Sequence, residues 1–296
     1  MAGGCAAPQR APRPRPVVRV MSGPTGGGFY PLGEGLVSAF GRLLPDITVE
    51  HHPSTGAVNN AELIQSGNAD LGFVFADVAY VSYVGRLDRL RGVAVLELTP
   101  LHLVVRSGIT SVRDLRGRRV ALGPPGSGTA LTAEIVLRAF GIRLSDIHTE
   151  AMQFDEAARR LVAGRLDAMF DTAIYPVEAV RMAAAAGARL MPLAGPPIDK
   201  LRLEYPFFRA AVIPRDAYRG MTEAVHTIGV DSLLVCRRDL DEELVYQLTR
   251  RFFEALPMLS SSQNALRLMD LDQAPATPIP LHDGAARYYR ERELLR

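Results

Sequence analysis

Two glycine-rich loops, each placed between a short apolar segment and a helical pattern, constrain the fold of this chain more than any other feature. They occupy residues 22–28 (Ser-Gly-Pro-Thr-Gly-Gly-Gly) and 123–129 (Gly-Pro-Pro-Gly-Ser-Gly-Thr). A loop of this kind aims free backbone N–H groups and the positive end of a helix dipole at whatever lies in front of it. Two such loops facing each other across a cleft would hold a small anion, which is the geometry of a two-lobed binding protein.

Strand and helix patterns alternate along the chain, and the same plan occurs twice. The first half predicts strands at 17–21, 47–50 and 69–75 and a helix over 30–44. In the second half, segment 166–171 repeats the features of 69–75, because each follows a helix and a glycine and carries an Asp beside an apolar run. This alternation is typical of the α/β class, with a doubly wound sheet in each lobe.

The chain has 296 residues, which suits two lobes better than one core. Segment 101–106 is predicted to carry the chain into the second lobe, and 226–230 to bring it back. We therefore expect a first lobe of residues 17–100 and 227–296 and a second lobe of residues 101–226. Two strands would form the hinge, and a ligand cleft would lie between the lobes.

The amino terminus differs in composition from the rest of the chain. Residues 6–16 contain four prolines and three arginines, so residues 1–16 are predicted to be a disordered tether. Residues 1–5 lack an apolar signal core but end in the small-small-Cys pattern of a bacterial lipoprotein. Either Cys5 is a lipid anchor whose signal peptide was trimmed or lost by a wrong start codon, or this end results from cloning or gene calling. No disulfide between Cys5 and Cys236 is expected.

Composition excludes several functional classes. The net charge is +2 and the arginines are spread along the chain, which argues against a nucleic-acid partner. No apolar run reaches the ~18 to 20 residues of a membrane helix, so the folded body is expected to be soluble. The six histidines show no metal-ligand spacing, the second loop lacks the lysine of a P-loop, and no Gly-x-Ser-x-Gly elbow occurs. We expect no cofactor, no metal and no catalytic residue.

Six motifs in a fixed order resemble the TAXI family of substrate-binding proteins, which serve TRAP-type secondary transporters. The resemblance extends from residue 17 to the end, and its specificity lies in the order of the motifs rather than in any one of them. The motifs are 22–27, 54–56 with Asn59, 66–72, 114–117, 123–129 and the block 280–291.

The resemblance implies a type II periplasmic binding protein fold that closes on one small solute. It also implies an extracytoplasmic monomer whose partner is a membrane-embedded TRAP permease driven by an ion gradient, commonly of sodium. The solute would be a small organic anion or amino acid such as glutamate, glutamine or 2-oxoglutarate. A sensory input domain, or an enzyme on the same fold that uses Asp171 or Asp77, remains the alternative.

The same resemblance assigns the ligand-binding residues. Backbone N–H groups at Ser127 to Thr129, with two hydroxyls, could bind a carboxylate without any arginine. The first lobe would contribute Thr25, Gly26, Gly27, Gly28, Phe29, Tyr30, Ser54, Thr55, Gly56, Asn59 and Asp77, and the second lobe Ser127, Gly128, Thr129, Asp171, Thr172 and Tyr175.

Several of these residues have two interpretations. Phe29 and Tyr30 either stack over the ligand or belong to the core, and Asp77 either receives an ammonium group or caps the helix that follows it. The chain also departs from the family pattern, with Ile174 in place of a small residue and with Asp171 where a carboxylate is not the rule. A carboxylate there would favour a ligand that donates an amino or hydroxyl hydrogen.

Overall fold

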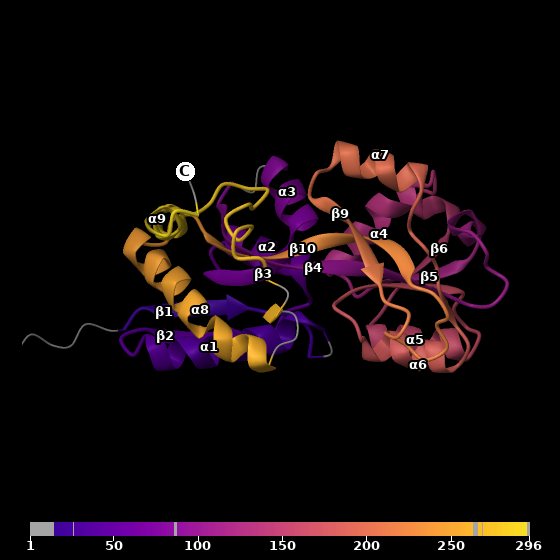
Figure 1. Cartoon of the computed structure of the whole chain (residues 1–296), viewed down its shortest axis with the longest axis horizontal. Coiled ribbons are helices and arrows are strands. Elements are labelled where there is room, and N and C mark those ends of the chain that lie inside the picture. The colour runs from indigo at the N-terminus through magenta and orange to yellow at the C-terminus, as the bar shows by residue number, and fades with distance from the viewer. Residues whose placement is uncertain (1–14, 26, 86–87, 263–265, 268, 295–296) are drawn as a thin grey trace, which may run out of the picture.

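In the computed structural model, which describes residues 15–25, 27–85, 88–262, 266–267 and 269–294, one sheet of ten strands passes through both halves of the chain (Figure 1). Its main path runs β2-β1-β3-β10-β4-β7-β5-β6, while β8 pairs with β4 and β9 pairs with β10. The strands are β1 (Val17–Met21), β2 (Thr48–His52), β3 (Leu71–Phe75), β4 (Leu90–Val105), β5 (Arg119–Gly123), β6 (His148–Ala151), β7 (Ala168–Thr172), β8 (Arg189–Leu190), β9 (Phe208–Ile213) and β10 (Val225–Arg237).

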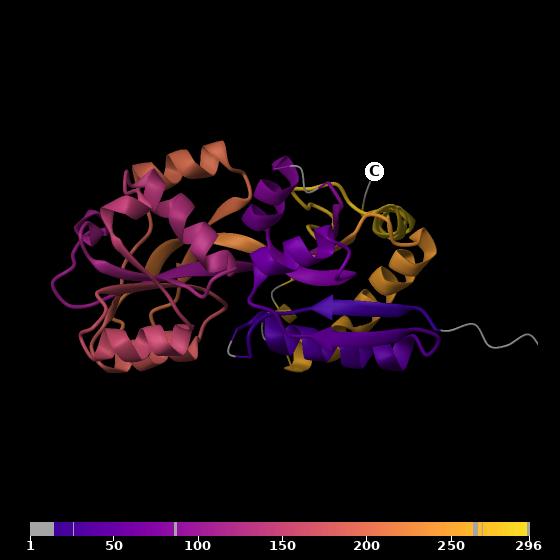
Figure 2. The ribbon, with the colours of Figure 1, turned by 180° about the vertical axis from the view of Figure 1, so that it is seen from behind.

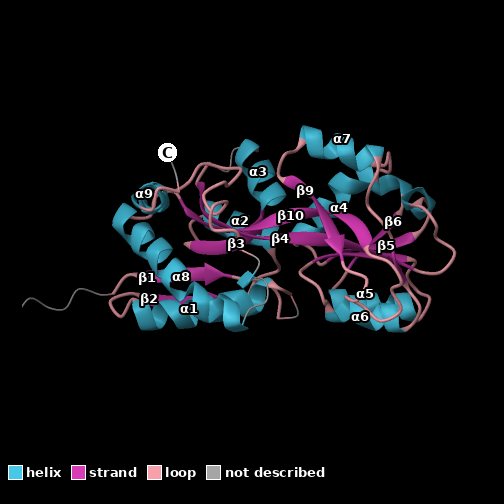
Figure 3. Cartoon of the chain, in the orientation of Figure 1, coloured by secondary structure: helices cyan, strands magenta, loops and turns pink. Residues whose placement is uncertain are grey.

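Helices cover both faces of this sheet, as Figures 2 and 3 show. Segment 196–213, for which the sequence analysis predicts no element, forms a helix and a strand. The helices within the described residues are α1 (Phe29–Leu43), α2 (Ala57–Gln65), α3 (Ala76–Val84), α4 (Gly128–Ala139), α5 (Phe154–Val162), α6 (Glu178–Ala185), α7 (Pro196–Glu204), α8 (Glu242–Ser262) and α9 (Asp283–Glu291), with single turns at Val112–Leu115 and Leu144–Asp146.

Two long neighbouring strands connect the halves. β4 and β10 pair antiparallel from Pro100 opposite Gly229 to Leu90 opposite Arg237, with an irregularity beside Ser232. The predicted crossing segments 101–106 and 226–230 overlap these strands closely. The expected lobe boundaries at residues 100 and 227 fall within β4 and β10, and each strand continues through its boundary without a break. The division into lobes therefore remains a proposal.

The repeated plan of the sequence has a structural counterpart at the start of each half. The backbone N and Nε of Arg19 both donate to Oδ2 of Asp70, at 2.9 Å each. Arg119 makes the same two bonds to Asp167, at 3.0 and 3.1 Å. Each arginine precedes a glycine-rich loop and each aspartate precedes a wholly buried strand, so the two loops occupy equivalent positions.

The apolar core is organised differently on the two faces of the sheet. On one face a single cluster joins α2 and α3 of the amino-terminal half to α4 and α7 of the other half. On the opposite face the core is divided, because α1, α8 and α9 form one cluster and α5 and α6 another. Figure 1 shows α3 and α7 above the sheet and the pairs α1/α8 and α5/α6 below it.

None of the helices in the described part of the chain combines the length and apolar character that crossing a membrane requires.

Candidate functional site

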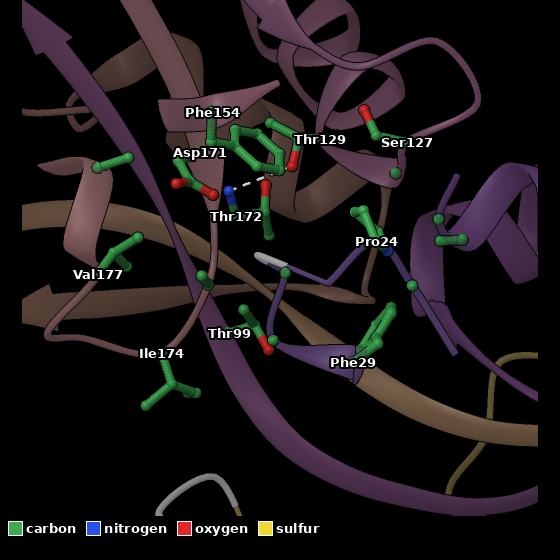
Figure 4. Close-up of a pocket in the computed structure, with 18 of the residues that line it drawn as sticks. Pro24, Phe29, Thr99, Ser127, Thr129, Phe154, Asp171, Thr172, Ile174 and Val177 are labelled. Atoms are coloured by element: carbon green, nitrogen blue, oxygen red, sulfur yellow. Dashed lines mark hydrogen bonds between the residues drawn. The ribbon is translucent and has the colours of Figure 1, made fainter. Parts of the chain in front are cut away.

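A cleft of about 840 Å³ lies between the first residues of α1 and α2 on one side and the first residues of α4, α5 and α6 on the other (Figure 4). Residues of β4 and β10 line it as well. Helix starts leave their first backbone N–H groups without partners inside the helix. The cleft therefore brings together several potential donors from both halves of the chain.

The first glycine-rich loop and the start of α1 line the cleft from the amino-terminal half. The ring of Phe29 stacks on Phe73 with centroids 5.7 Å apart, and its centroid lies 5.0 Å from that of Phe75. Phe29 thus packs on the core and also lines the cleft, and its stacking over a ligand stays a prediction. The loop residues that line the cleft are Gly23, Pro24, Thr25, Gly27 and Gly28, and Gly26 lies outside the described residues.

Tyr30 does not line the cleft. Its ring meets His51 edge-on, with centroids 5.0 Å apart, and His51 in turn lies 2.7 Å from the Ser22 hydroxyl. The geometry therefore does not support stacking of Tyr30 over a ligand. Consecutive residues of an α-helix lie about 100° apart around its axis, so Phe29 and Tyr30 point in different directions.

Thr55 and Gly56 line the cleft, whereas Ser54 and Asn59 do not. The Ser54 hydroxyl accepts a hydrogen bond from Gly56 N at 3.1 Å and donates to the carbonyl of Ser22 at 3.3 Å. Asn59 N donates to the carbonyl of Gly126 at 3.3 Å. Ser54 and Asn59 therefore shape the loop and its contact with the opposite half.

The two halves touch at the start of α2. The carbonyl of Gly126 accepts a bond from Val58 N at 3.1 Å. A Cβ atom on Gly56, whose φ is +130°, would lie 3.1 Å from the Cα of Ser127, and one on Gly128 would lie 2.3 Å from the ring of Phe75. Glycine at these positions permits an approach that a side chain would block.

The second glycine-rich loop ends as the start of α4. The Ser127 hydroxyl caps the helix by accepting from Ala130 N at 3.3 Å. The Thr129 hydroxyl accepts from Thr172 N at 3.2 Å, as Figure 4 shows, which ties the helix start to the end of β7. Ser127, Gly128 and Thr129 all line the cleft. Ser127 N already donates to the carbonyl of Pro124 at 3.1 Å, so the N–H groups of Gly128 and Thr129 are the ones at this helix start that can receive a carboxylate.

Asp171, near the end of β7, is 2% exposed and lines the cleft with Thr172. Burial raises the pKa of Asp171 to about 7. Its Oδ2 has no hydrogen-bond partner among the described residues. Residues at the starts of α5 and α6, including Phe154 and Val177, line the same region (Figure 4). Asp171 is thus a buried carboxyl group with an unused acceptor at the wall of the cleft.

Two other predicted residues lie elsewhere. Asp77 is fully buried outside the cleft, where Oδ1 accepts from Val78 N at 2.7 Å and Oδ2 accepts from the Thr132 hydroxyl of α4 at 2.5 Å. It therefore joins the two halves, and the geometry does not support an ammonium contact. Tyr175 lines a smaller neighbouring cavity of about 350 Å³, while Ile174 lines both cavities.

A polar group on the hinge strands was not predicted from the sequence. Glu97 and Thr99 of β4 and Ser232 of β10 all line the cleft and are buried. The hydroxyls of Thr99 and Ser232 lie 2.8 Å apart. A charged residue inside the apolar run 93–98 is the signal that could have drawn attention to Glu97.

Apolar cleft residues were also missed, because they come from segments without a distinctive motif. Leu32, Ala57, Phe75, Phe154, Pro176 and Val177 are examples. Within the described residues, no group of three or more His, Cys, Asp or Glu side chains could hold a metal ion. Cys236 is a buried free thiol, and Cys5 lies outside the described residues.

Comparison with known proteins finds one matching family model and solved structures of similar fold. The model of the NMT1-like family matches residues 20–292. The alkanesulfonate-binding protein SsuA from Xanthomonas axonopodis pv. citri, bound to MOPS, is 17% identical, with 97% of this chain and 96% of that chain covered and a TM-score of 0.50. A putative L-cystine ABC transporter protein from Listeria monocytogenes is 15% identical, with 86% and 98% covered and a TM-score of 0.52.

These findings confirm one expectation and correct another. The predicted fold class is confirmed, because the chain has the mixed α/β fold of periplasmic solute-binding proteins around a central sheet. The assignment to the TAXI family is wrong, since the matching model is that of the NMT1-like family and the similar structures are named as other kinds of transport protein. Weak glycine motifs suit helix starts in any fold of this type, so their order misled the family assignment.

Proposed function

The chain belongs to the NMT1-like family, and on this premise we propose that it is an extracytoplasmic solute-binding protein. It captures a small solute in the cleft and delivers it to a membrane permease, without converting it chemically. The observation that carries this proposal is the cleft itself, whose volume of about 840 Å³ suits a small molecule and whose walls come from both halves of the chain.

The wall of the cleft that is formed by the start of α4 and the end of β7 suggests the chemistry of the solute. The start of α4 at Ser127 to Thr129 would hold a carboxylate, and the unused oxygen of Asp171 would accept from an amino group. Thr172 N donates a hydrogen bond to the Thr129 hydroxyl, which keeps the start of α4 beside the end of β7. We therefore favour an amino acid over a keto acid such as 2-oxoglutarate, which lacks the amino group.

Delivery to a permease would follow closure of the cleft about β4 and β10. A solute that contacts both walls favours the closed form, because only that form offers both sets of contacts. The Listeria neighbour is named as an ABC transporter protein, so a permease of the ABC type is the partner that we propose. Attachment of a lipid at Cys5 stays a prediction.

A thermal-shift panel on protein that has been unfolded and refolded to remove carried-over solute tests the proposal. The panel contains L-glutamate, L-glutamine, 2-oxoglutarate, L-lysine, L-cystine and an alkanesulfonate. A solute at ~100 times its dissociation constant should stabilise the protein by about 2.7 kcal/mol. We expect a selective shift that the Asp171→Asn variant weakens. Failure of every compound to shift the transition would contradict capture of such solutes.

A further inference from the structure

Glu97 is the least expected residue of the cleft. It is 4% exposed, it lies on the hinge strand β4, and it lines both the main cleft and the smaller cavity beside it. Its Oε2 has no hydrogen-bond partner among the described residues. A buried carboxylate with an unused oxygen is unfavourable unless a cation or donors compensate for the lost hydration.

The neighbours of Glu97 compensate only in part. Burial raises the pKa of Glu97 to about 7, and the neighbouring Ser232 hydroxyl, which lies 2.8 Å from that of Thr99, offsets this only in part. Asp231 is a like charge near Glu97. Arg209 lines the smaller cavity, but its guanidinium is paired with Asp231. No described cation is thus dedicated to Glu97.

The other charged side chains that line the main cleft are acidic as well. Its acidic residues are Glu97, Asp155, Asp171 and Glu178, while none of its described residues is Lys, Arg or His. Helix starts supply partial positive charge, but only near their own first turns. A solute with a second carboxylate would meet repulsion near Glu97, whereas a solute with a cationic end would replace the missing partner of Glu97.

The spacing along β4 separates Glu97 from the Asp171 region. Asp171 lies opposite His102 in the sheet register, five residues beyond Glu97. At about 3.3 Å per residue this is a backbone separation of at most about 17 Å, because β4 is irregular between Val95 and Leu98. Side chains reach inward from both positions, so an elongated solute can contact the two carboxyl groups with its opposite ends.

We propose that Glu97 receives the cationic end of the solute, so that the cleft selects a basic amino acid rather than a neutral or acidic one. This inference rests on the proposed function and names the solute class of the same site. The head of the solute would lie at α4 and Asp171, and its ammonium or guanidinium group at Glu97. Ser232 and Thr99, which line the same cleft, are neutral and cannot supply the missing positive charge.

Calorimetric titration of the refolded full chain with L-lysine, L-glutamine and L-glutamate tests the inference. We expect L-lysine to bind at least tenfold more tightly than L-glutamine and more tightly still than L-glutamate. In Glu97→Gln, affinity for L-lysine should fall at least tenfold and its preference over L-glutamine should disappear. Glu223→Gln, which removes an equal charge from an exposed side chain outside the cleft, is the matched control and should keep the preference.

Three results would overturn the inference. One is tighter binding of L-glutamate or of an alkanesulfonate than of L-lysine, and this would leave the proposed function standing. Another is an unchanged lysine-to-glutamine ratio in a Glu97→Gln protein whose thermal unfolding matches that of the wild type. The third concerns Glu97→Asp, which keeps the negative charge but moves it back by one methylene group. Affinity for L-lysine equal to that of the wild type in this variant would contradict a direct contact with Glu97. If no compound of the wider panel binds, the proposed function itself is contradicted.

Discussion

The two faces of the central sheet differ in how they join the halves of the chain. On the face of α2, α3, α4 and α7, one apolar cluster crosses between the halves without interruption. On the other face, the cluster of α1, α8 and α9 is separate from that of α5 and α6. The cleft is lined on this face by the first residues of α1, α5 and α6, and the first residues of α2 and α4 line it where the two halves touch. We propose from this difference that closure of the cleft moves the divided face, while the continuous face acts as the pivot.

Contacts near the pivot support this interpretation. Thr132 of α4 donates to the buried carboxyl group of Asp77 on α3, at 2.5 Å. Gly128 of α4 lies where any Cβ atom would come within 2.3 Å of the Phe75 ring. Close packing of this kind tolerates small rotations but not separation, because separation would expose apolar surface.

The largest effect that we predict comes from a change within the continuous cluster. Leu137→Ala on α4 removes a wholly buried side chain from that cluster and should lower the free energy of unfolding by about 2 to 5 kcal/mol. Urea unfolding followed by circular dichroism and by tyrosine fluorescence should give one coincident transition, because both halves share this core. Two separated transitions would break the comparison between the faces.

A pH-dependent effect at the pivot should be the next largest. Burial raises the pKa of Asp77 from its ordinary value of 3.8 to about 6. An acid whose pKa is raised in the native state binds its proton more tightly there, so the free energy of unfolding falls as the pH rises from about 4 to about 6. Asp77→Asn resembles the neutral form of the acid. Its free energy of unfolding should exceed that of the wild type by up to about 3 kcal/mol at pH 8 and by little at pH 4.

Chemical denaturation at these two pH values measures the difference. The Thr132 hydroxyl has two acceptors, Asp77 Oδ2 and the carbonyl of Gly128 at 3.0 Å, but only one proton to donate. A neutral group at position 77 can donate to the Thr132 oxygen, which leaves the Thr132 proton free for the carbonyl of Gly128. A variant less stable than wild type at pH 8 would mean that the bond from Thr132 to ionised Asp77 outweighs its burial.

The smallest effect concerns the divided face. Ile174 is half-buried and lines the cleft, so it should contact the solute rather than the continuous core. Ile174→Ala should weaken binding of the tightest panel compound by about 1 kcal/mol, or several-fold. Its free energy of unfolding should change by less than that. Calorimetry gives the loss of binding free energy, and urea unfolding of the same preparation gives the loss of stability. A larger loss of stability than of binding would assign Ile174 to the core.

Much of the fold could be predicted from the sequence because local patterns encode it. Apolar runs such as 69–75 form buried strands, and a glycine loop before each of α1 and α4 marks a helix start. The duplicated pairs Arg19–Asp70 and Arg119–Asp167 explain why the two halves look alike in sequence. The length of β4 and β10 was not evident, since only part of each strand has a simple apolar pattern.

The site was predictable only where a motif carries it. Thr55, Ser127, Thr129 and Asp171 lie at the ends of strands or the starts of helices, and each lines the cleft. The place of Asp77 depends on Thr132, 55 residues away in the chain, which no local pattern reveals. Glu97 was missed because its importance arises from burial between two strands that are distant in sequence.

One distance measurement tests the central claim, which is that the cleft face closes on solute while the continuous face acts as the pivot. Spin labels are placed on exposed positions across the divided face, Ser38 and Val162, and across the continuous face, Val84 and Leu203, with Cys5 replaced by serine. Pulsed dipolar spectroscopy compares each pair with and without the tightest panel compound. We predict that the Ser38–Val162 distance shortens by several ångströms on binding, roughly the scale of a domain closure, while the Val84–Leu203 distance changes little. Equal changes in both pairs, or no change across the cleft, would contradict the account.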